Sequence, residues 1–354
     1  MTEKQTLLEV KNLHTYFYLE NGISKALHGV SFDIKKGETL GVVGESGCGK
    51  SMTALSIMQL VPDPPGKIVS GEILFQGVDL LKKDKKEMRQ MRGSKIAMIF
   101  QEPMTSLNPV MTIGKQISET IRIHENVSKA EAKKRAIDML KLVKIPEPEQ
   151  RYGEYPHQLS GGMRQRVMIA IALACQPDLL ICDEPTTALD VTVQAQILKL
   201  IAGLQKKTGM SVMLITHDLG VISQVADRIV IMYAGKIVEY GTKKLIFENP
   251  LHPYTEALLK AVPRLTDEEG KELYMIKGMV PDLTKKQKGC LFAERCPYAR
   301  TICYQEEPEL QTVGEGRVCC HRYGALAKLA PDTSSVFQTA SMWQDQTKGG
   351  ADHE

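Results

Sequence analysis

The sequence lacks any long hydrophobic run. Across 354 residues the longest apolar stretch lies around positions 167–174, far short of the ~20 residues that a membrane-spanning helix needs. The first ten residues, MTEKQTLLEV, also lack the apolar core of a secretory signal peptide. These absences predict a cytoplasmic protein that would act at a membrane only through partners.

The sequence also has little net charge and no visible internal repeat. Its 45 Lys and Arg residues against 42 Asp and Glu give a formal charge of +3, too small to indicate nucleic acid or an anionic lipid surface as a partner. A content of 43% hydrophobic and 25% charged residues is typical of a globular protein, and the length suggests one large or two moderate domains.

The stretch 38–58 has the strongest pattern in the chain. A short apolar strand precedes GESGCGKS, which fits G-x-x-x-x-G-K-[ST], and a helix follows. Such a loop curls backbone N–H groups around phosphate, while its lysine and serine suit the β/γ-phosphates and Mg²⁺. A chance glycine turn is the alternative, and the strand–loop–helix setting argues against it. The predicted nucleotide-binding residues are Gly44, Glu45, Ser46, Gly47, Cys48, Gly49, Lys50, Ser51 and Met52.

A second acidic pattern accompanies this loop. The apolar strand predicted at 179–182 ends in Asp183 and Glu184. Asp183 can hold Mg²⁺ through water, and Glu184 can polarise the water that attacks the γ-phosphate. The alternative is a solvated strand end, which the nearby phosphate loop makes less attractive.

The order of patterns along the chain predicts an α/β fold. Alternating apolar positions at 7–35 indicate antiparallel strands, and a further strand is expected at 71–75. The basic segment 80–95, the segment 129–142 with apolar residues three and four apart, and the apolar segment 167–174 are predicted helices. Buried strands alternate with helices as far as residue 233.

One segment carries a specific resemblance. Residues 159–166, LSGGMRQR, resemble the LSGGQ signature of ABC-type ATPases. The other family elements follow in order: Gln101 matches the Q-loop glutamine, residues 188–190 the D-loop and His217 the switch histidine. Phe17 lies where the family places an aromatic side chain on adenine, with the adjacent Tyr16 as the alternative.

The resemblance implies a particular organisation. An ABC-type nucleotide-binding domain would span 1–245, with an antiparallel β subdomain and a helical insertion at about 105–165. A C-terminal extension with a cysteine cluster would span 246–330. Residues 331–354 are polar and predicted to be disordered.

The resemblance also implies a mechanism. Two such domains dimerise head to tail, so that Ser160, Gly161 and Gly162 would contact ATP held by a partner's phosphate loop. Glu184, His217 and Gln101 would be the catalytic residues, and Ser51, Gln101 and Asp183 would serve Mg²⁺. Met163 replaces the usual glutamine of the signature, with little expected loss because the contacts are assigned to its neighbours.

The match narrows to one group of transporters. LSGGMRQRV, the HPYT segment at 252–255 and the cysteine-rich C-terminal region resemble ATPase subunits of dipeptide and oligopeptide importers over residues 5–325. This implies a second, related ATPase chain, two membrane permeases, an extracytoplasmic substrate-binding protein, and a peripheral location on the cytoplasmic face of the cell membrane. Nickel importers of the same group are the main alternative. A soluble ABC protein acting on DNA or ribosomes and an Fe–S sensor are the others.

Five of the eight cysteines lie between positions 290 and 320. Their spacing fits structural zinc poorly, because zinc pairs usually have two to four intervening residues. The peptide-importer relatives carry a [4Fe–4S] cluster here, which implies ligation by Cys290, Cys296, Cys303 and Cys320. Cys320 is preferred to Cys319 because the family ligand precedes a histidine like His321. Zinc and free thiols are the alternatives.

Cys48 suggests a smaller hypothesis. It lies inside the phosphate loop, where the helix N-terminus and Lys50 would favour its thiolate. A buried, inert side chain is the equal alternative.

Overall fold

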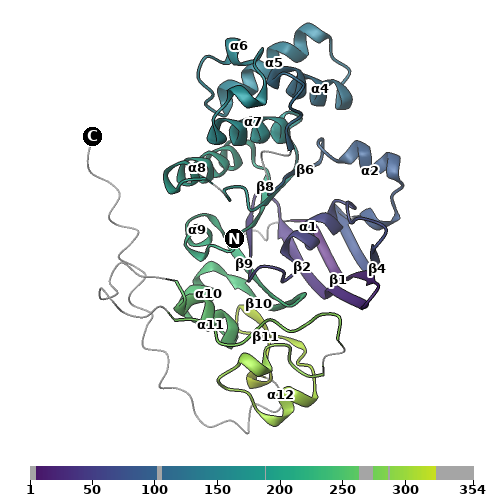
Figure 1. The fold of residues 1–354 in the computed structure, drawn as a ribbon, viewed down its shortest axis with the longest axis vertical. Coiled ribbons are helices and arrows are strands. Elements are labelled where there is room, and N and C mark those ends of the chain that lie inside the picture. The colour runs from purple at the N-terminus through teal and green to yellow at the C-terminus, as the bar shows by residue number, and fades with distance from the viewer. Residues whose placement is uncertain (1–4, 102–105, 188, 263–273, 286–287, 324–354) are drawn as a thin grey trace, which may run out of the picture.

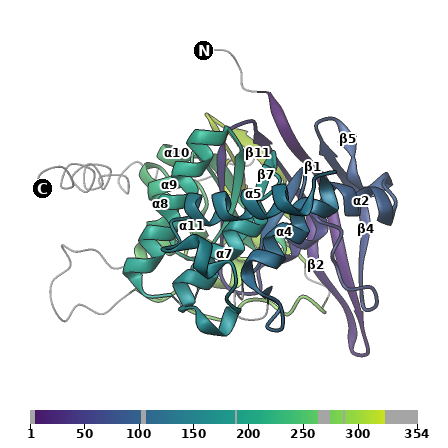
Figure 2. The same cartoon turned by 90° about the horizontal axis from the view of Figure 1, so that it is seen from above.

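The computed structural model describes residues 5–101, 106–187, 189–262, 274–285 and 288–323. Within these ranges the chain forms two sheets with helices packed around them (Figure 1). Viewed from above, the strands of the smaller sheet lie to one side of the main helices (Figure 2). None of the helices in the described ranges has the length and apolar character needed to cross a bilayer.

The larger sheet has eight described strands in the order β11-β12-β10-β9-β3-β8-β7-β6. The five from β9 to β6 run parallel, whereas β10, β12 and β11 are joined to them by antiparallel pairing. Their bounds are β3 Thr39–Val43, β6 Ile96–Ile99, β7 Leu179–Asp183, β8 Ser211–Ile215, β9 Arg228–Tyr233, β10 Lys236–Thr242, β11 Leu310–Val313 and β12 Gly316–Cys319.

The smaller sheet is antiparallel, in the order β2-β1-β4-β5. Its strands are β1 Thr6–Leu19, β2 Gly22–Lys35, β4 Gly66–Phe75 and β5 Val78–Asp79. Apolar residues from its inner face pack with β3 and α1 into one hydrophobic core. The phosphate-loop helix therefore lies between the two sheets.

The helices gather mainly on the other side of the large sheet. They are α1 Lys50–Ile57, α2 Lys85–Met91, α4 Ile113–His124, α5 Lys129–Leu142, α6 Pro148–Arg151, α7 Gly161–Leu173, α8 Val191–Thr208, α9 Leu219–Val225, α10 Lys243–Glu248, α11 Pro253–Lys260 and α12 Thr301–Gln305. Short 3₁₀ turns lie at Leu80–Lys82, Pro156–Gln158, Ala293–Arg295 and His321–Tyr323.

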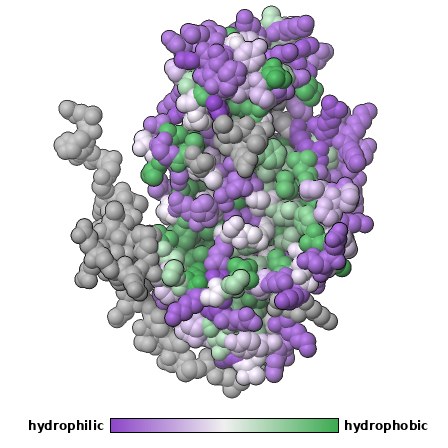
Figure 3. Space-filling model, viewed as in Figure 1, coloured by the Kyte–Doolittle hydropathy of each residue, from purple (hydrophilic) through white to green (hydrophobic). Residues whose placement is uncertain are grey.

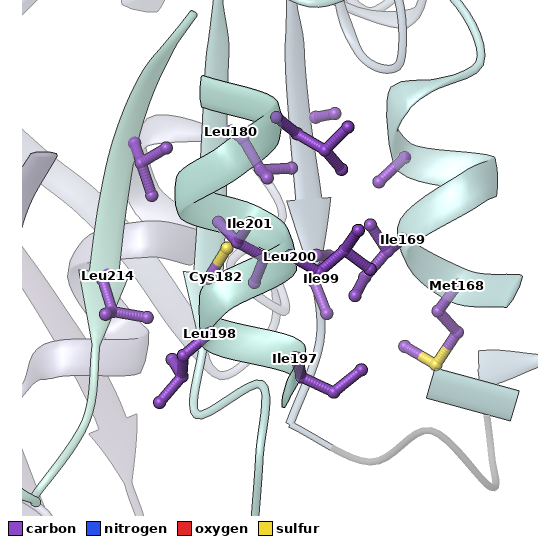
Figure 4. Packing of buried hydrophobic residues seen from close by; sticks show 14 of the residues in the cluster. Ile99, Met168, Ile169, Leu180, Cys182, Ile197, Leu198, Leu200, Ile201 and Leu214 are labelled. Atoms are coloured by element: carbon purple, nitrogen blue, oxygen red, sulfur yellow. The ribbon is translucent and has the colours of Figure 1, made fainter. Parts of the chain in front are cut away.

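A second core joins α7 and α8 to the parallel strands. Ile169 of α7 and Ile201 of α8 lie with Ile99, Cys182 and Leu214 of the sheet in this core (Figure 4). Hydrophilic residues cover most of the surface of the helical part around α4–α6 (Figure 3). The ends of β3 and β7 are thus held against packed helices, which fixes the loops that follow them.

The sequence located most of these elements. The predicted α/β core with an antiparallel portion is present, and the predicted strand end at Val43 is confirmed. Other bounds were wrong: α7 begins at Gly161, β4 begins at Gly66, and α2 covers only Lys85–Met91 of the predicted helix 80–95. The exposed, polar first turn of α7 lacks the apolar spacing that would have indicated its start.

The C-terminal hairpin was not predicted. Strands β11 and β12 pair with each other, and β12 joins the large sheet through Glu239 and Tyr240 of β10. Four-residue strands among Gly, Pro and Cys give little periodic signal, which explains the omission. The domain limits 1–245, 105–165 and 246–330 stay predictions, and the predicted tail 331–354 lies outside the described residues.

Candidate nucleotide site and cysteine cavity

The phosphate loop is pressed closely against its neighbours. It connects β3 to α1, and Gly49, the residue before α1, has a left-handed φ of 103°. A Cβ atom on Gly49 would lie 2.9 Å from the Ala26 carbonyl oxygen, and one on Gly44 would lie 2.2 Å from the Met232 carbonyl oxygen. Both positions therefore require glycine, for backbone approach as well as for conformation.

Lys50 lies over the loop that precedes it. Its side chain is buried, and Nζ donates to the carbonyl oxygens of Gly44 at 2.8 Å and Glu45 at 3.1 Å. Because Lys50 also begins α1, its charge adds to the positive end of the helix dipole. The predicted anion-binding character of the loop agrees with this placement.

The predicted magnesium residues Ser51 and Asp183 are brought together. Ser51 Oγ donates to Asp183 Oδ1 at 2.9 Å, across 132 positions of sequence. Burial raises the pKa of the Asp183 carboxyl, which the hydrogen bond from Ser51 opposes. Hydroxyl and carboxylate oxygens are ligands that Mg²⁺ takes, directly or through water, so this pair suits the predicted ion.

Glu184 is the meeting point of the predicted catalytic residues. Its carboxylate accepts a hydrogen bond from Gln101 Nε2 at 3.2 Å and lies 3.4 Å from His217 Nδ1. Thr187 Oγ1 donates to the same carboxylate at 3.0 Å. Thr187 was not predicted from the sequence, because a lone threonine after an acidic strand end does not indicate a functional residue. The amide nitrogen of Gln101 thus points to Glu184, although Gln101 was also assigned to Mg²⁺.

Ser160 and Gly161 of the signature segment are exposed at the beginning of α7. Ser160 caps this helix by accepting a hydrogen bond from the Met163 N–H at 3.4 Å, and the Gly162 backbone approaches Val193 of α8. In Figure 1, α7 lies in the helical part of the molecule, whereas α1 lies between the sheets. The structure therefore does not bring Ser160, Gly161 and Gly162 to the phosphate loop of the same chain. Of the predicted D-loop, residue 188 lies outside the described residues.

Phe17 is the predicted adenine-stacking residue. It lies on β1 opposite Ser24 of β2 and Gly66 of β4. The neighbouring Tyr16 is engaged elsewhere, because its hydroxyl lies 3.1 Å from His28 Nδ1. This leaves Phe17 as the candidate, and its contact with adenine stays a prediction.

The reactive-thiolate hypothesis for Cys48 is wrong. The side chain is only 1% exposed, and burial raises the pKa of its thiol despite the opposing charge of Lys50. The sequence shows the helix N-terminus and the lysine, but not the burial that outweighs them. The inert alternative holds, and Met52 beside the loop likewise packs on the hydrophobic core.

Four of the C-terminal cysteines line a single small cavity. They are Cys290, Cys296, Cys303 and Cys320, and His252 and Phe292 complete part of the wall. Cys319 is directed elsewhere, with its Sγ 2.9 Å from the Pro308 carbonyl oxygen. The structure thus gathers the four cysteines that the sequence analysis named and separates the fifth from them.

Burial changes the acidity of the thiols that line this cavity. Burial, and to a smaller extent the neighbouring thiols, raise the pKa of Cys290 to about 12 and that of Cys296 to about 11. Among the described residues, no three His, Cys, Asp or Glu side chains form a group that could hold a metal ion. The described side chains thus do not form a ready-made metal site, so the predicted [4Fe–4S] cluster stays a prediction, with zinc and free thiols as its alternatives.

Comparisons with known proteins agree with this geometry. The family description "ABC transporter" matches residues 27–187, and "Oligopeptide/dipeptide transporter, C-terminal region" matches residues 238–303. The chain is 55% identical to the dipeptide transport ATP-binding protein DppD of Bacillus subtilis, over 86% of this chain and 90% of that protein. It is also 55% identical to the oligopeptide transport ATP-binding protein OppD of the same organism, over 87% of this chain and 86% of that protein.

A solved structure shows the same fold. It is the dimeric, post-hydrolysis state of the ATP-binding cassette MJ0796 bound to ADP and Pi, with a TM-score of 0.60 and 30% identity. The match covers 67% of this chain and 98% of that one, so the predicted cassette fold is confirmed. The chain therefore belongs to the ATP-hydrolysing subunits of ABC transporters, and its residues 238–303 carry the C-terminal region of the oligopeptide/dipeptide group.

Proposed function

We propose that this chain couples ATP hydrolysis to the import of dipeptides or oligopeptides. The proposal rests on one observation: a predicted catalytic carboxylate cluster and a peptide-transporter region occur in the same chain. Glu184, Gln101 and His217 converge beside the Ser51–Asp183 pair, and the region matched to oligopeptide/dipeptide transporters follows directly on the same sheet. The first feature supplies the chemistry, and the second supports the class of solute.

Each residue of the site has a proposed role. Glu184 orients and polarises the attacking water, and His217 and Gln101 hold its carboxylate in place from two sides. Ser51 and Asp183 hold Mg²⁺, which when bound neutralises charge on the phosphates. Lys50 and the N–H groups of the loop bind the phosphates, and Phe17 stacks on adenine.

The site is half of a working unit in this proposal. The N-terminus of α7 is accessible, because Ser160 and Gly161 are exposed and Gly162 is partly exposed. In this proposal it binds the γ-phosphate of ATP held by a partner chain. The dimeric state printed for the MJ0796 cassette supports a head-to-tail pair of this kind. The partner proposed here is a second, related ATPase chain.

The remaining partners follow from the transporter class. Two membrane permeases would form the pathway, and an extracytoplasmic binding protein would deliver the solute, with this chain on the cytoplasmic face of the membrane. Relatives whose names specify dipeptide and oligopeptide transport support peptides as the solute. A nickel importer of the same group is the second candidate.

Uptake by the complete transporter tests the solute. The assembled complex in proteoliposomes should take up a labelled dipeptide or pentapeptide when ATP is supplied, and the Glu184→Gln complex should not. ATP-dependent uptake of radioactive nickel without peptide uptake would overturn the peptide assignment.

We also propose a [4Fe–4S] cluster in the cysteine cavity. Each cysteine of such a cluster binds a different iron atom, so the four thiols surround a volume instead of converging on one ion. Cys290, Cys296, Cys303 and Cys320 lie around a common cavity, which fits this donor set. The cluster would tie the C-terminal segments together.

Iron analysis of adjacent variants tests the cluster. Protein purified anaerobically should be brown and contain iron and acid-labile sulfide, and Cys320→Ser should lose most of both. Cys319→Ser is the matched control and should retain them, because Cys319 lies outside the cavity wall. Colourless protein with one zinc per chain, or metal-free protein, would overturn the assignment.

A further inference from the structure

The C-terminal region reaches back to the phosphate loop through one arginine. Arg295 Nη1 donates to Glu45 Oε2 at 2.7 Å and Nη2 donates to Glu45 Oε1 at 2.9 Å, across 250 positions of sequence. This is the bidentate geometry in which a guanidinium binds a carboxylate most strongly. Glu45 is the second residue of GESGCGKS, so the contact is made to the loop itself.

The arginine is held rigidly on its own side. Its side chain is only 5% exposed, and it also donates to the carbonyl oxygens of Ile276 and Lys277. The guanidinium lies 5.7 Å from the centre of the Tyr233 ring and 5.9 Å from that of Phe292. A side chain with so many partners loses little further freedom when it binds Glu45, so it can act as a fixed anchor.

A second side chain from the same region binds the same loop residue. The hydroxyl oxygen of Tyr254, in α11, accepts a hydrogen bond from the backbone N–H of Glu45 at 2.9 Å. Tyr254 is fully buried, and its ring packs against Tyr233 and Phe292. With Lys50 bound to its carbonyl oxygen, Glu45 has its N–H, its C=O and its carboxylate all engaged.

The contact has an electrostatic consequence for nucleotide binding. A free carboxylate at Glu45, next to the loop glycine Gly44, would repel the phosphates that the loop has to receive. Arg295 pairs with that charge and fixes the conformation of the residue that carries it. A loop held in one conformation also loses less entropy when it closes around phosphate.

We propose that Arg295 is a positioning residue for nucleotide binding. Through Glu45 it neutralises and holds the phosphate loop, so that the C-terminal region sets the affinity of the site for nucleotide. The proposal depends on the ATP site of the family. It does not depend on which solute is transported or on what fills the cysteine cavity.

Equilibrium binding of a fluorescent ADP analogue to the full chain tests this role. Arg295→Gln should weaken binding by about tenfold, since a bidentate charged pair is lost and the Glu45 charge is left unpaired. Arg295→Lys keeps one positive charge and should recover part of the loss. Arg317→Gln is the matched control, because Arg317 is an exposed arginine on β12 of the same region, and its binding should equal that of the parent.

Combination with Glu45→Gln separates positioning from a general effect on folding. If Arg295 acts through Glu45, adding Arg295→Gln to the Glu45→Gln chain should change affinity by less than twofold. Thermal melting of every variant shows whether the fold is retained. Binding by a folded Arg295→Gln chain within twofold of the parent, or a full tenfold loss in the Glu45→Gln background, would overturn the proposal.

Discussion

Glu184 combines a strained backbone with a crowded carboxylate. Its φ is +46°, in the left-handed region that a residue with a side chain seldom occupies, and its N–H donates to the Ile215 carbonyl oxygen of β8. The turn directs the side chain toward Gln101, Thr187 and His217 instead of continuing β7. Strain of this kind is typical of functional positions, where surrounding structure maintains it.

The Glu184→Gln substitution tests the proposed water-activating role. The amide keeps the size of the side chain but is a far weaker base, so ATP turnover in the assembled transporter should fall by at least about a hundredfold. Nucleotide affinity should change little, because Lys50 and the loop are untouched. A colorimetric phosphate-release assay and equilibrium binding measure the two effects.

Glu119→Gln provides the control for that measurement. Glu119 is an exposed glutamate on α4, remote from the carboxylate cluster in sequence and in the fold. Its turnover should match that of the parent. Near-normal turnover in Glu184→Gln would show that another group activates the water.

At this scale the sequence predicted residues that belong to ordered motifs. Gln101 and His217 were identified by their order, and the structure places both side chains at Glu184. Thr187 and Arg295 were missed, because their roles arise from contacts that no local spacing encodes. Cys48 was judged from its sequence neighbours, whereas burial decides its chemistry.

Among the secondary-structure elements, Arg228 is one of the links between the antiparallel sheet and the large sheet. Arg228 at the start of β9 donates to Glu38 before β3 and to Asp33 of β2, and Tyr240 of β10 bonds to Asp33. Burial alone would raise the pKa of Asp33, but the hydrogen bonds and charge of Arg228 lower it to about 2. Four strand regions are thereby connected through one largely buried cluster.

Removing Arg228 should destabilise the junction of the sheets. Arg228→Leu leaves Asp33 and Glu38 without their cation, at an expected cost of about 2 kcal/mol in the free energy of unfolding. Urea titration measures the change. An exposed arginine such as Arg89 of α2, replaced by leucine, should cost much less.

Acid titration should report the same cluster. The folded pKa of Asp33 lies below its ordinary value of 3.8, so its contribution is fully present above pH 4 and is lost as pH falls toward about 2. Asp33→Asn removes the titrating group, and its stability should fall less steeply over this interval. Equal slopes for the two proteins would contradict the assignment.

Among the elements, periodic helices were predicted best. The predicted helix 129–142 coincides with α5, whose apolar spacing marks its extent and whose Ser128 cap marks its first turn. The strand β10 and the hairpin β11–β12 were missed, although β10 and β12 each follow a two-residue turn. β10 is buried on both faces and so shows no polar–apolar alternation, and β11 and β12 are only four residues long.

As a whole, the molecule separates its phosphate loop from its signature segment. α1 lies between the two sheets, while α7 begins at the surface of the helical part (Figure 1). In the described part of the chain, the phosphate loop and the signature segment therefore lie apart. The proposed partner supplies what is missing.

Replacement of Ser160 tests this division. Ser160→Arg should leave nucleotide affinity of the isolated chain unchanged, since Ser160 does not meet its own loop. In the assembled transporter it should lower ATP turnover on the order of a hundredfold at the site it completes, because a phosphate-binding position is filled by a bulky side chain. Loss of affinity in the isolated chain would argue that the segment serves its own loop.

The pairing of β12 with β10 also limits how far the chain can be shortened from its C-terminal side. A protein ending near residue 245 would keep every nucleotide-binding motif but would leave β10 as an open edge, with unpaired N–H and C=O groups facing solvent. Open edges pair readily with strands of other molecules. A shortened ATPase of this kind should therefore aggregate more readily than the full chain, so the hairpin also protects the solubility of the cassette.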